Sequence, residues 1–537
     1  MKEIKELKFE EMTLEQKVGF AMVGGSWRPI LNDKEDLEYV LELIKKRSLG
    51  ALWVSCHAGE NRDFAEVVRI IKEAADYPIL IMTDEESGFG NYMMGNPIAL
   101  GYIGSEDAAY AYGKAIAIES RKAGYNFVCN PLLDRVRGNC PCGGVLRSLH
   151  PDKEMSAKLA AAMCEGMHDG GILNCAKHYP SPRGLPIDSH MAEGYSEQTK
   201  EELLEDNLYA YKYLIDRGLV DAVMVGHRKM ANIDNKYPAS LSEKVMDILR
   251  KDLSFDGIVV TDALEMMGVV AKFGEVDPKW MCIDAGCDLA LGFTVKTKAT
   301  YDAILNAVKS GKLPMDKLDE AVKRVLKYQH KAYELETNPK FDKLTEEEEK
   351  LAKDINKHSI AAICDDGVDC TISREGKHFF VLLTQNEVDL NKLIENDTMS
   401  VSWYKPERIV KKIKENFPNS GYASLTEFPS VPQLSEICRK RLGYDDVVFI
   451  TFFENAPYVG KEAFTPRITS LMEAWQISEN CISAAIHFGN PFLIEEMPHI
   501  PRIISACKAT ACTEYAIDVL AGKLEAKGKI PYDIKLK

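Results

Sequence analysis

The chain has 537 residues, which is enough for two or three domains with large cores. Its 67 Lys and Arg against 82 Asp and Glu give a net charge of −15, which disfavours nucleic acid and anionic membranes as partners. No apolar run reaches membrane-spanning length, and the N-terminus lacks the apolar core of a secretory signal. We therefore expect a cytoplasmic protein whose 14 cysteines are mostly buried free thiols.

Short apolar runs alternate with helical stretches through the first two thirds of the chain. The predicted strands are 49–55, 78–83, 125–129, 172–176, 222–225, 257–261 and 289–291. The predicted helices include 65–75, 107–123, 155–169 and 242–251. Such alternation indicates βα units and a parallel sheet. Over roughly 330 residues it favours an α/β fold of the (β/α)8 TIM-type barrel kind with insertions, and a doubly wound sheet is the alternative.

The alternation breaks in a charged stretch that has almost no apolar side chains. This stretch predicts a linker at residues 336–350, which separates a catalytic (β/α)8 barrel at 1–335 from a smaller α/β sandwich domain at 351–537. The strands predicted for the second domain are 379–383, 447–452, 481–487 and 502–505. Two roles stay open for this domain: it shapes one side of the site, or it forms a homodimer.

Several predicted barrel strands end in an ionisable side chain. These side chains are Asp84, Asp134, Lys177, His178, His227 and Asp262. Each of the acids alone is also explained as the N-cap of the following helix. In a (β/α)8 barrel, however, catalytic groups lie at the carboxyl ends of the strands. Five such strand ends on one face therefore predict a shared pocket.

The loop after Lys177 and His178 is rich in proline and long for a βα connection. Asp188 and His190 lie two residues apart at its far end. In an extended or turn segment, the carboxylate can accept a hydrogen bond from one imidazole nitrogen and leave the other facing the pocket. The alternative is a loop Asp-Ser-His that only caps the following helix.

No metal or organic cofactor is expected. Cys140 and Cys142 resemble half of a zinc site, but no second Cys or His pair lies at ligand spacing, so a loop with two thiols explains them better. No Gly-rich phosphate loop follows a strand, and no His-Glu-x-x-His motif is present.

Taken together, these stretches resemble glycoside hydrolase family 3. The matching segments are 12–19, 84–88, 146–148, 175–180, 188–190 and 238–266. Within the last one, a Thr-Asp pair closes a strand, as in the nucleophile segment of that family. The pattern Lys-His followed by Asp-Ser-His resembles the branch that cleaves β-linked N-acetylglucosamine. The likeness covers most of residues 10–330 and continues weakly in 488–491 and 528–531.

The resemblance implies a role for each matched position. Asp262 is implied to be the nucleophile, and His190 the general acid and then the general base, with Asp188 as its partner. The residues implied to bind the sugar are Asp84, Arg147, Lys177 and His178, with Asp134 and His227 as further candidates. These residue types suit retaining hydrolysis, which needs a carboxylate nucleophile and a proton donor. The implied substrate is a small oligosaccharide or glycoside.

The loop at Ser181 to Gly184 departs from the family pattern. The family has Pro-Gly spacing there, whereas this chain reads Pro-Ser-Pro-Arg-Gly. This change leaves the mobility of the loop and the substrate specificity open. We hypothesise that Arg183 favours an anionic leaving group or acceptor.

Three other functions remain alternatives. A phosphorylase would use the same centre with phosphate as the acceptor, because a histidine does not repel an anion as a carboxylate does. A β-glucosidase would lack the Asp-Ser-His loop, which this chain has. A non-catalytic sugar-binding protein would explain the altered loop but not the presence of Asp188, His190 and Asp262.

Overall fold

The computed structural model describes residues 4–25, 33–55, 64–140, 144–183, 187–292, 296–384, 406–453 and 463–537. They group into two compact units. The first unit is drawn from residues 1–92, 106–135 and 152–352, and the second from 93–105, 136–151 and 353–537. None of the described helices is long and apolar enough to cross a membrane.

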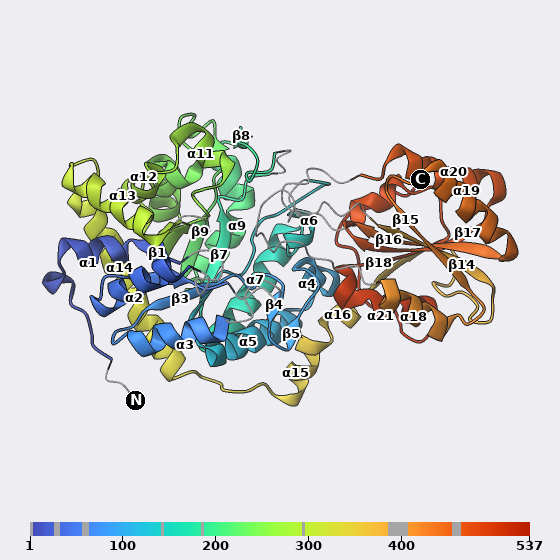
Figure 1. Ribbon diagram of the computed structural model, residues 1–537, viewed down its shortest axis with the longest axis horizontal. Helices are drawn as coiled ribbons and strands as arrows, with labels where there is room; N and C mark the ends of the chain where they lie inside the picture. Colours follow the sequence, from blue (N-terminus) through green and yellow to red (C-terminus); the bar gives the residue numbers. More distant parts are fainter. Residues whose placement is uncertain are drawn as a thin grey trace. The chain divides into compact units, whose positions relative to one another are not determined.

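Eight parallel strands of the first unit form a closed barrel (Figure 1). In sheet order they are β11 (Ile258–Thr261), β9 (Ala222–Val225), β7 (Leu173–Tyr179), β6 (Phe127–Val128), β3 (Leu80–Thr83), β2 (Ala51–Trp53), β1 (Met22–Gly24) and β12 (Ala290–Leu291). A parallel bridge between Val260 and Leu289 joins β11 to the segment before β12. The predicted barrel is therefore confirmed, because a doubly wound sheet stays open.

Helices follow the strands on the outside of the barrel (Figure 1). They are α1 (Leu14–Phe20), α2 (Lys34–Lys45), α3 (Phe64–Ala74), α5 (Glu106–Ala123), α7 (Lys153–Asp169), α8 (Lys200–Glu202), α9 (Tyr209–Ile215), α10 (Glu243–Asp247), α11 (Met267–Phe273), α12 (Pro278–Asp284), α13 (Thr297–Lys309), α14 (Met315–Thr337) and α15 (Glu346–Lys353). Side-chain caps mark where two of these helices begin. Thr13 and Gln16 form a capping box at α1, and Asp152 caps α7.

Several shorter elements complete the two units. Two small sheets pair β4 (Gly88–Phe89) with β5 (Tyr92–Met93) and β8 (Tyr195–Ser196) with β10 (Lys229–Met230). The short helical turns are Phe9–Glu11, Leu203–Asn207, Ala239–Leu241, Ile248–Asp252, Arg441–Gly443 and Pro491–Glu496.

The charged stretch after α14 is held against the barrel helices. Lys114 of α5 is almost fully buried and pairs with Glu348 of α15 at 2.8 Å. The same ammonium lies 3.8 Å from the centre of the Phe341 ring. These contacts hold α15 against α5, so the stretch expected to be a linker carries packed structure of its own.

The second unit is built on a mixed six-stranded sheet. In order its strands are β13 (Ala361–Cys364), β18 (Arg502–Ala506), β17 (Ile482–Gly489), β16 (Asp446–Phe453), β14 (His378–Thr384) and β15 (Gly421–Thr426). Only the pairing of β13 with β18 is antiparallel. Its helices are α4 (Ile98–Ile103), α6 (Gly144–Arg147), α16 (Ile355–His358), α18 (Pro406–Asn416), α19 (Val431–Lys440), α20 (Pro466–Glu479) and α21 (Ala509–Leu520).

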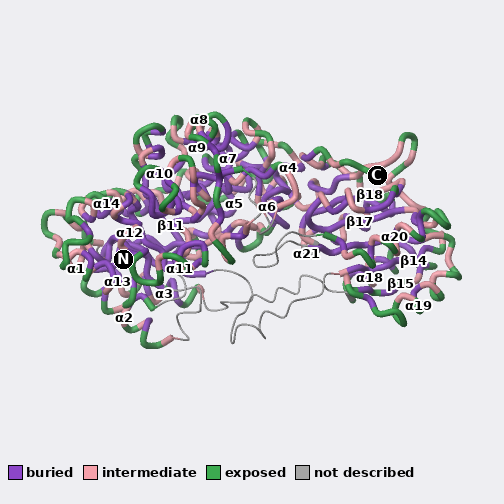
Figure 2. Tube along the Cα trace, turned by 90° about the horizontal axis from the view of Figure 1, so that it is seen from above, coloured by how far each residue is buried: buried purple, intermediate pink, exposed green. Residues whose placement is uncertain are grey.

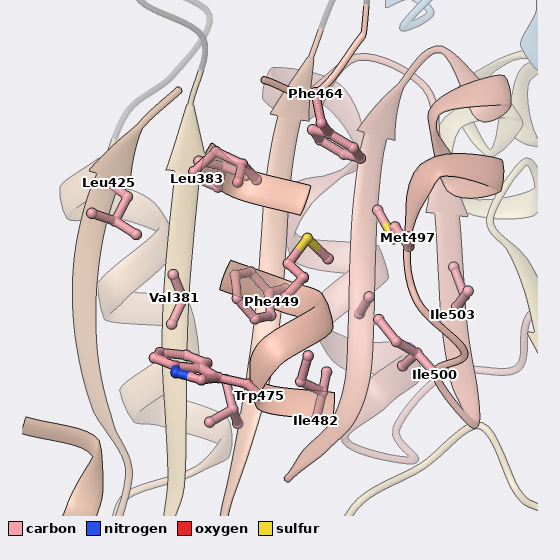
Figure 3. Packing of buried hydrophobic residues seen from close by; sticks show 14 of the residues in the cluster. Val381, Leu383, Leu425, Phe449, Phe464, Trp475, Ile482, Met497, Ile500 and Ile503 are labelled. Carbon is pink, nitrogen blue, oxygen red and sulfur yellow. The ribbon is translucent and has the colours of Figure 1, made fainter. Parts of the chain in front are cut away.

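Both faces of this sheet are covered, as in a three-layer α/β domain. Figure 3 shows Trp475 of α20 packed near Val381 and Phe449, which project from one face of the sheet. The alternate side chains point to the other face, where Phe380 contacts Phe417 beyond the end of α18. The four central strands, β14, β16, β17 and β18, are consequently buried along most of their length, whereas the outer helix surfaces are exposed (Figure 2). The predicted second α/β domain is confirmed.

Two segments from the first part of the chain complete the second unit. The Tyr102 hydroxyl lies 3.1 Å from the Ser505 hydroxyl at the end of β18. Asn490 donates a hydrogen bond to the Asn139 side chain at 2.8 Å. Long-range contacts therefore assign residues 93–105 and 136–151 to this unit, although they precede most of the barrel in sequence.

The described cysteines carry free thiols. Cys129, Cys164, Cys175 and Cys287 are buried as predicted, whereas Cys56 lies outside the described residues.

Candidate active site

Asp262 directly follows the last residue of β11, at the carboxyl end of the barrel. Its backbone N–H donates to the Val225 carbonyl of β9 at 2.8 Å, which continues the parallel ladder by one residue. The N–H of Ala263 donates to its Oδ1 at 2.7 Å. The carboxylate stays 24% exposed. It is therefore fixed by the backbone on one side and accessible on the other.

Three histidine side chains interact electrostatically with the Asp262 carboxylate. His178 Nε2 lies 3.9 Å from Asp262 Oδ2, and His190 and His227 also interact with it. Burial alone would raise the pKa of Asp262. Charge on the three imidazoles and the Ala263 N–H outweigh burial and lower this pKa below its ordinary value. The side chain is thus ionised at neutral pH, as a carboxylate nucleophile must be.

His178 is oriented from behind by Asp134. Its Nδ1–H donates to Asp134 Oδ2 at 2.6 Å, and its backbone N–H reaches the same oxygen at 3.3 Å. The Ser181 hydroxyl donates to the other oxygen of Asp134 at 3.0 Å. His178 is preceded by a cis peptide bond. These contacts leave Nε2 as the nitrogen of His178 that faces Asp262.

Lys177 lies in β7 with only 1% of its side chain exposed and binds two acids at the end of β3. Its ammonium pairs with Asp84 and, at 2.7 Å, with Glu86. Sequence reasoning identified Lys177 and Asp84 but missed Glu86. Glu86 lies two positions after Asp84, and this spacing could have indicated it as a second partner of Lys177.

Glu85 lies between these two acids but points away from Lys177. Its side chain is 1% exposed, and Ser120 of α5 donates a hydrogen bond to Oε2 at 2.6 Å. Burial, opposed by the Ser120 hydrogen bond and reinforced by Asp84, raises the pKa of Glu85 to about 8. Glu85 is therefore mostly protonated at neutral pH.

Asp188 and His190 form the dyad that their spacing suggested. Asp188 Oδ1 accepts hydrogen bonds from the backbone N–H of His190 at 2.9 Å and from its Nδ1 at 2.7 Å. The Asp188 side chain is 2% exposed, whereas His190 is 24% exposed. The buried carboxylate thus favours the tautomer that carries hydrogen on Nδ1 and holds the ring by that nitrogen.

His227 follows β9 and is almost fully buried. Its Nε2 lies 2.8 Å from the Ala263 carbonyl, to which it donates, and Nδ1 lies 2.8 Å from the Ser240 hydroxyl. Burial lowers its pKa in spite of the opposing charge of Asp262. With both ring nitrogens bonded inside the protein, His227 supports the backbone next to Asp262.

Two arginines from the sequence analysis remain, Arg147 and Arg183. Arg147 ends α6 in the second unit, and its sugar-binding role stays a prediction. Arg183 donates from Nε to Asp206 at 2.8 Å, and Arg135 pairs with the same carboxylate. The hypothesis that Arg183 selects an anionic leaving group or acceptor also stays a prediction.

The thiol pair considered as half of a zinc site falls partly outside the described residues, since Cys142 is not among them. Over the described parts of the chain, no group of three or more His, Cys, Asp and Glu side chains could hold a metal ion.

Comparisons with known proteins identify the family of the chain. The model of the glycosyl hydrolase family 3 N-terminal domain matches residues 6–328. A β-hexosaminidase of Haemophilus influenzae is 29% identical over 273 residues, which is 49% of this chain and 77% of that protein. One of Neisseria meningitidis serogroup C is 33% identical over 192 residues, which is 36% of this chain and 52% of that protein. The chain thus spans about half the length of the meningococcal relative.

Solved structures share the fold over nearly the whole chain. A family 3 β-N-acetylglucosaminidase from Paenibacillus sp. has a TM-score of 0.80 at 24% identity, covering 98% of this chain and 100% of its own. A β-glucoside phosphorylase has a TM-score of 0.75 at 21% identity, covering 98% and 94%. Because the family model covers more than half of the chain and the two relatives matched by sequence are β-hexosaminidases, this protein belongs to glycosyl hydrolase family 3 and is a glycoside hydrolase.

Proposed function

We propose that the protein removes terminal β-linked N-acetylglucosamine with retention of configuration. The observation that carries the proposal is the pairing of an ionised strand-end carboxylate, Asp262, with a buried Asp188 that orients His190. These are the two groups that retaining hydrolysis requires: a nucleophile and a proton donor. The charge on His190 acts on Asp262, so both groups serve one site.

In the first step, an oxygen of Asp262 attacks the anomeric carbon while the bond to the leaving oxygen breaks. His190 transfers its Nε2 proton to that oxygen, and Asp188 stabilises the imidazolium before the transfer. In the second step, neutral His190 takes a proton from water, which attacks the anomeric carbon and releases Asp262. The proton returns to Nε2, so the enzyme is regenerated.

The other polar residues around Asp262 suit recognition of sugar hydroxyls. Asp84 and Glu86 present carboxylate oxygens held in place by Lys177, and Asp134 holds His178. Charged side chains fixed in this way accept and donate hydrogen bonds at low cost in side-chain entropy. His227 positions the Asp262 loop in this proposal, and the sugar-binding role of Arg147 stays a prediction.

The choice of N-acetylglucosamine rests on two supports. The relatives with the matching barrel are named β-hexosaminidases, and this chain keeps the Asp-Ser-His dyad. The Asp-Ser-His dyad does not support a β-glucosidase function.

A phosphorylase at the same centre is the second candidate. The acid/base of this site is an imidazole, and the charge of its partner Asp188 is buried behind the ring. An anionic phosphate approaching the glycosyl-enzyme therefore meets a neutral or cationic group rather than an exposed carboxylate.

The leaving group dependence of a His190→Ala enzyme tests the proposed function. The variant should lose about 100-fold or more in kcat/KM on an alkyl β-N-acetylglucosaminide, whose leaving group needs protonation, and much less on a 2,4-dinitrophenyl glycoside. Equal losses on both substrates would show that His190 is not the proton donor.

Product analysis with and without inorganic phosphate separates the two acceptors. Free N-acetylglucosamine under both conditions is expected for the hydrolase, whereas a sugar 1-phosphate formed with phosphate would identify a phosphorylase. Matched aryl β-glucosides serve as the control for the sugar, and a higher kcat/KM on them would contradict the proposed specificity.

A further inference from the structure

The segment that carries the dyad rests on α11, the helix that follows Asp262. The N–H of Gly268, near the start of α11, donates to the Ser189 carbonyl at 3.0 Å. Ser189 is the residue between Asp188 and His190. A single backbone hydrogen bond therefore locates the middle of the dyad on this helix.

A second contact involves the other end of α11. Glu193 Oε1 lies 4.0 Å from the ammonium of Lys272, and its Oε2 lies 3.0 Å from the ammonium of Lys229 in β10. Gly268 and Lys272 are four residues apart, so they lie on the same face of the helix. The segment is thus attached to α11 at both ends and to β10 by an ion pair.

Gly268 is the tightest point of this attachment. A Cβ added there would lie 3.2 Å from the Ser189 carbonyl oxygen and 3.4 Å from that of Ala192. It would also lie 3.7 Å from His227 Cβ. The absence of a side chain at Gly268 lets α11 approach the dyad segment and the supporting histidine together.

The same helix continues the loop that carries the nucleophile. Gly268 lies six residues after Asp262, and the Ala263 carbonyl in that loop accepts the hydrogen bond from His227. A short path therefore runs from Asp262 through the loop to Gly268, and across one hydrogen bond to Ser189 and His190.

We propose that Gly268, together with the Glu193–Lys229 ion pair, positions His190 for proton transfer to the leaving group. This inference rests on the proposed role of His190. Gly268 and Glu193 act through the segment and touch no reacting atom, so they are positioning residues. Loss of either attachment moves the imidazole relative to Asp262 while the nucleophile itself stays in place.

A Gly268→Ala variant tests the proposal through its dependence on the leaving group. A misplacement of a few tenths of an ångström to one ångström costs about 10- to 100-fold where the misplaced group takes part. We expect a loss of about 10-fold or more in kcat/KM on an alkyl β-N-acetylglucosaminide. On the 2,4-dinitrophenyl glycoside, which needs little protonation, the loss should stay below about 3-fold.

Gly194→Ala is the matched control, because it lies in the same segment and its added Cβ would have no neighbour closer than 3.7 Å. It should resemble the wild type on both substrates. Glu193→Gln is the second variant, which weakens the other attachment without crowding Gly268. It should show the same leaving group dependence with a smaller loss, so the proposal is testable even where Gly268→Ala folds poorly.

The outcomes separate this inference from the function on which it rests. If the loss of activity depends on the leaving group in His190→Ala but not in Gly268→Ala and Glu193→Gln, His190 remains the proton donor and only the positioning role is overturned. If the loss in His190→Ala does not depend on the leaving group either, the assignment of the proton donor is overturned, and the inference with it. Equal losses on both substrates in Gly268→Ala show general damage to the site and also contradict the inference.

Discussion

At the amino-terminal end of the barrel, Asp221 precedes β9 and Asp288 lies just before β12, and both are fully buried. Asp288 accepts hydrogen bonds from Arg250 at 2.6 Å, Arg324 at 3.0 Å and the Val259 N–H at 2.7 Å. Asp221 is bonded to His168 at 2.7 Å, to the Asn174 N–H at 3.0 Å and to Lys331. Cations and backbone amides occupy both oxygens of each carboxylate.

At the carboxyl end, Asp84 and Asp262 also follow barrel strands, but each stays 24% exposed. Asp262 has one close backbone donor, and its nearest imidazole nitrogen is 3.9 Å away. Aspartates thus have two kinds of environment in this barrel, one at each end. Carboxylates bonded on all sides hold strands and helices together, whereas carboxylates with an exposed side remain available to react or to bind.

Removal of the Asp262 carboxylate gives the largest expected effect of this comparison. Asp262→Asn keeps the acceptor for the Ala263 N–H but removes the proposed nucleophile, so kcat/KM should fall by about four orders of magnitude. The free energy of unfolding should change by less than about 1 kcal/mol, because no buried cation loses its only partner. Steady-state kinetics and urea unfolding measure the two effects. A large loss of stability would show that the two ends of the barrel are built alike.

The reverse result is expected at the other end. Asp288→Asn leaves the guanidinium groups of Arg250 and Arg324 without their buried counter-ion and should lower the free energy of unfolding by about 3 kcal/mol. The activity of the folded enzyme should remain within about 2-fold, since the residue lies at the opposite end of the strands from Asp262. Unfolding curves and active-site titration separate the two quantities. A stable but inactive variant would contradict this expectation.

Glu85 is a third kind of acid in this barrel, because it is buried at the carboxyl end and no cation is among the groups that shift its pKa. Its folded pKa of about 8 exceeds the ordinary value of 4.5, so the folded state retains a proton that the unfolded chain loses. Stability from this group is therefore full below about pH 4.5 and decreases as the pH rises to about 8. The total decrease is on the order of 3–5 kcal/mol.

A Glu85→Gln variant removes this pH dependence. Relative to the wild type, it should gain stability between pH 5 and pH 8.5 by roughly the same 3–5 kcal/mol. Unfolding midpoints across this pH range provide the measurement, with the exposed Glu73→Gln as control. Parallel pH profiles for the wild type and Glu85→Gln would show that Glu85 is ionised in the folded protein.

Most strands of the barrel could be predicted from the sequence because they are apolar and end in polar side chains. Strands β9 and β11 were predicted to within one residue at each end, whereas β7 extends three residues beyond its predicted end and includes Lys177 and His178. The three-residue strand β1 was missed, since it directly follows α1 and reads as a continuation of that helix. The edge strands β13 and β15 were also missed, because Ser and Thr interrupt the apolar pattern of β15 and three of the four residues of β13 are only partly buried.

The site was predictable in its residue types but not in its pairings. The spacing of Asp188 and His190 indicated their hydrogen bond, whereas Asp134 and His178, which also share one, lie 44 residues apart in the sequence. The packing of Gly268 against Ser189 likewise depends on tertiary approach, and nothing local marks it. Residues 93–105 and 136–151 join the second unit through contacts that no local pattern encodes.

Covalent trapping of the glycosyl-enzyme tests whether Asp262 is the nucleophile. A slow 2-deoxy-2-fluoro glycosyl substrate should form a stable ester, and peptide mapping by mass spectrometry should place the label on Asp262 in the peptide that follows β11. A label on Asp188, Asp84 or any other residue would contradict the account.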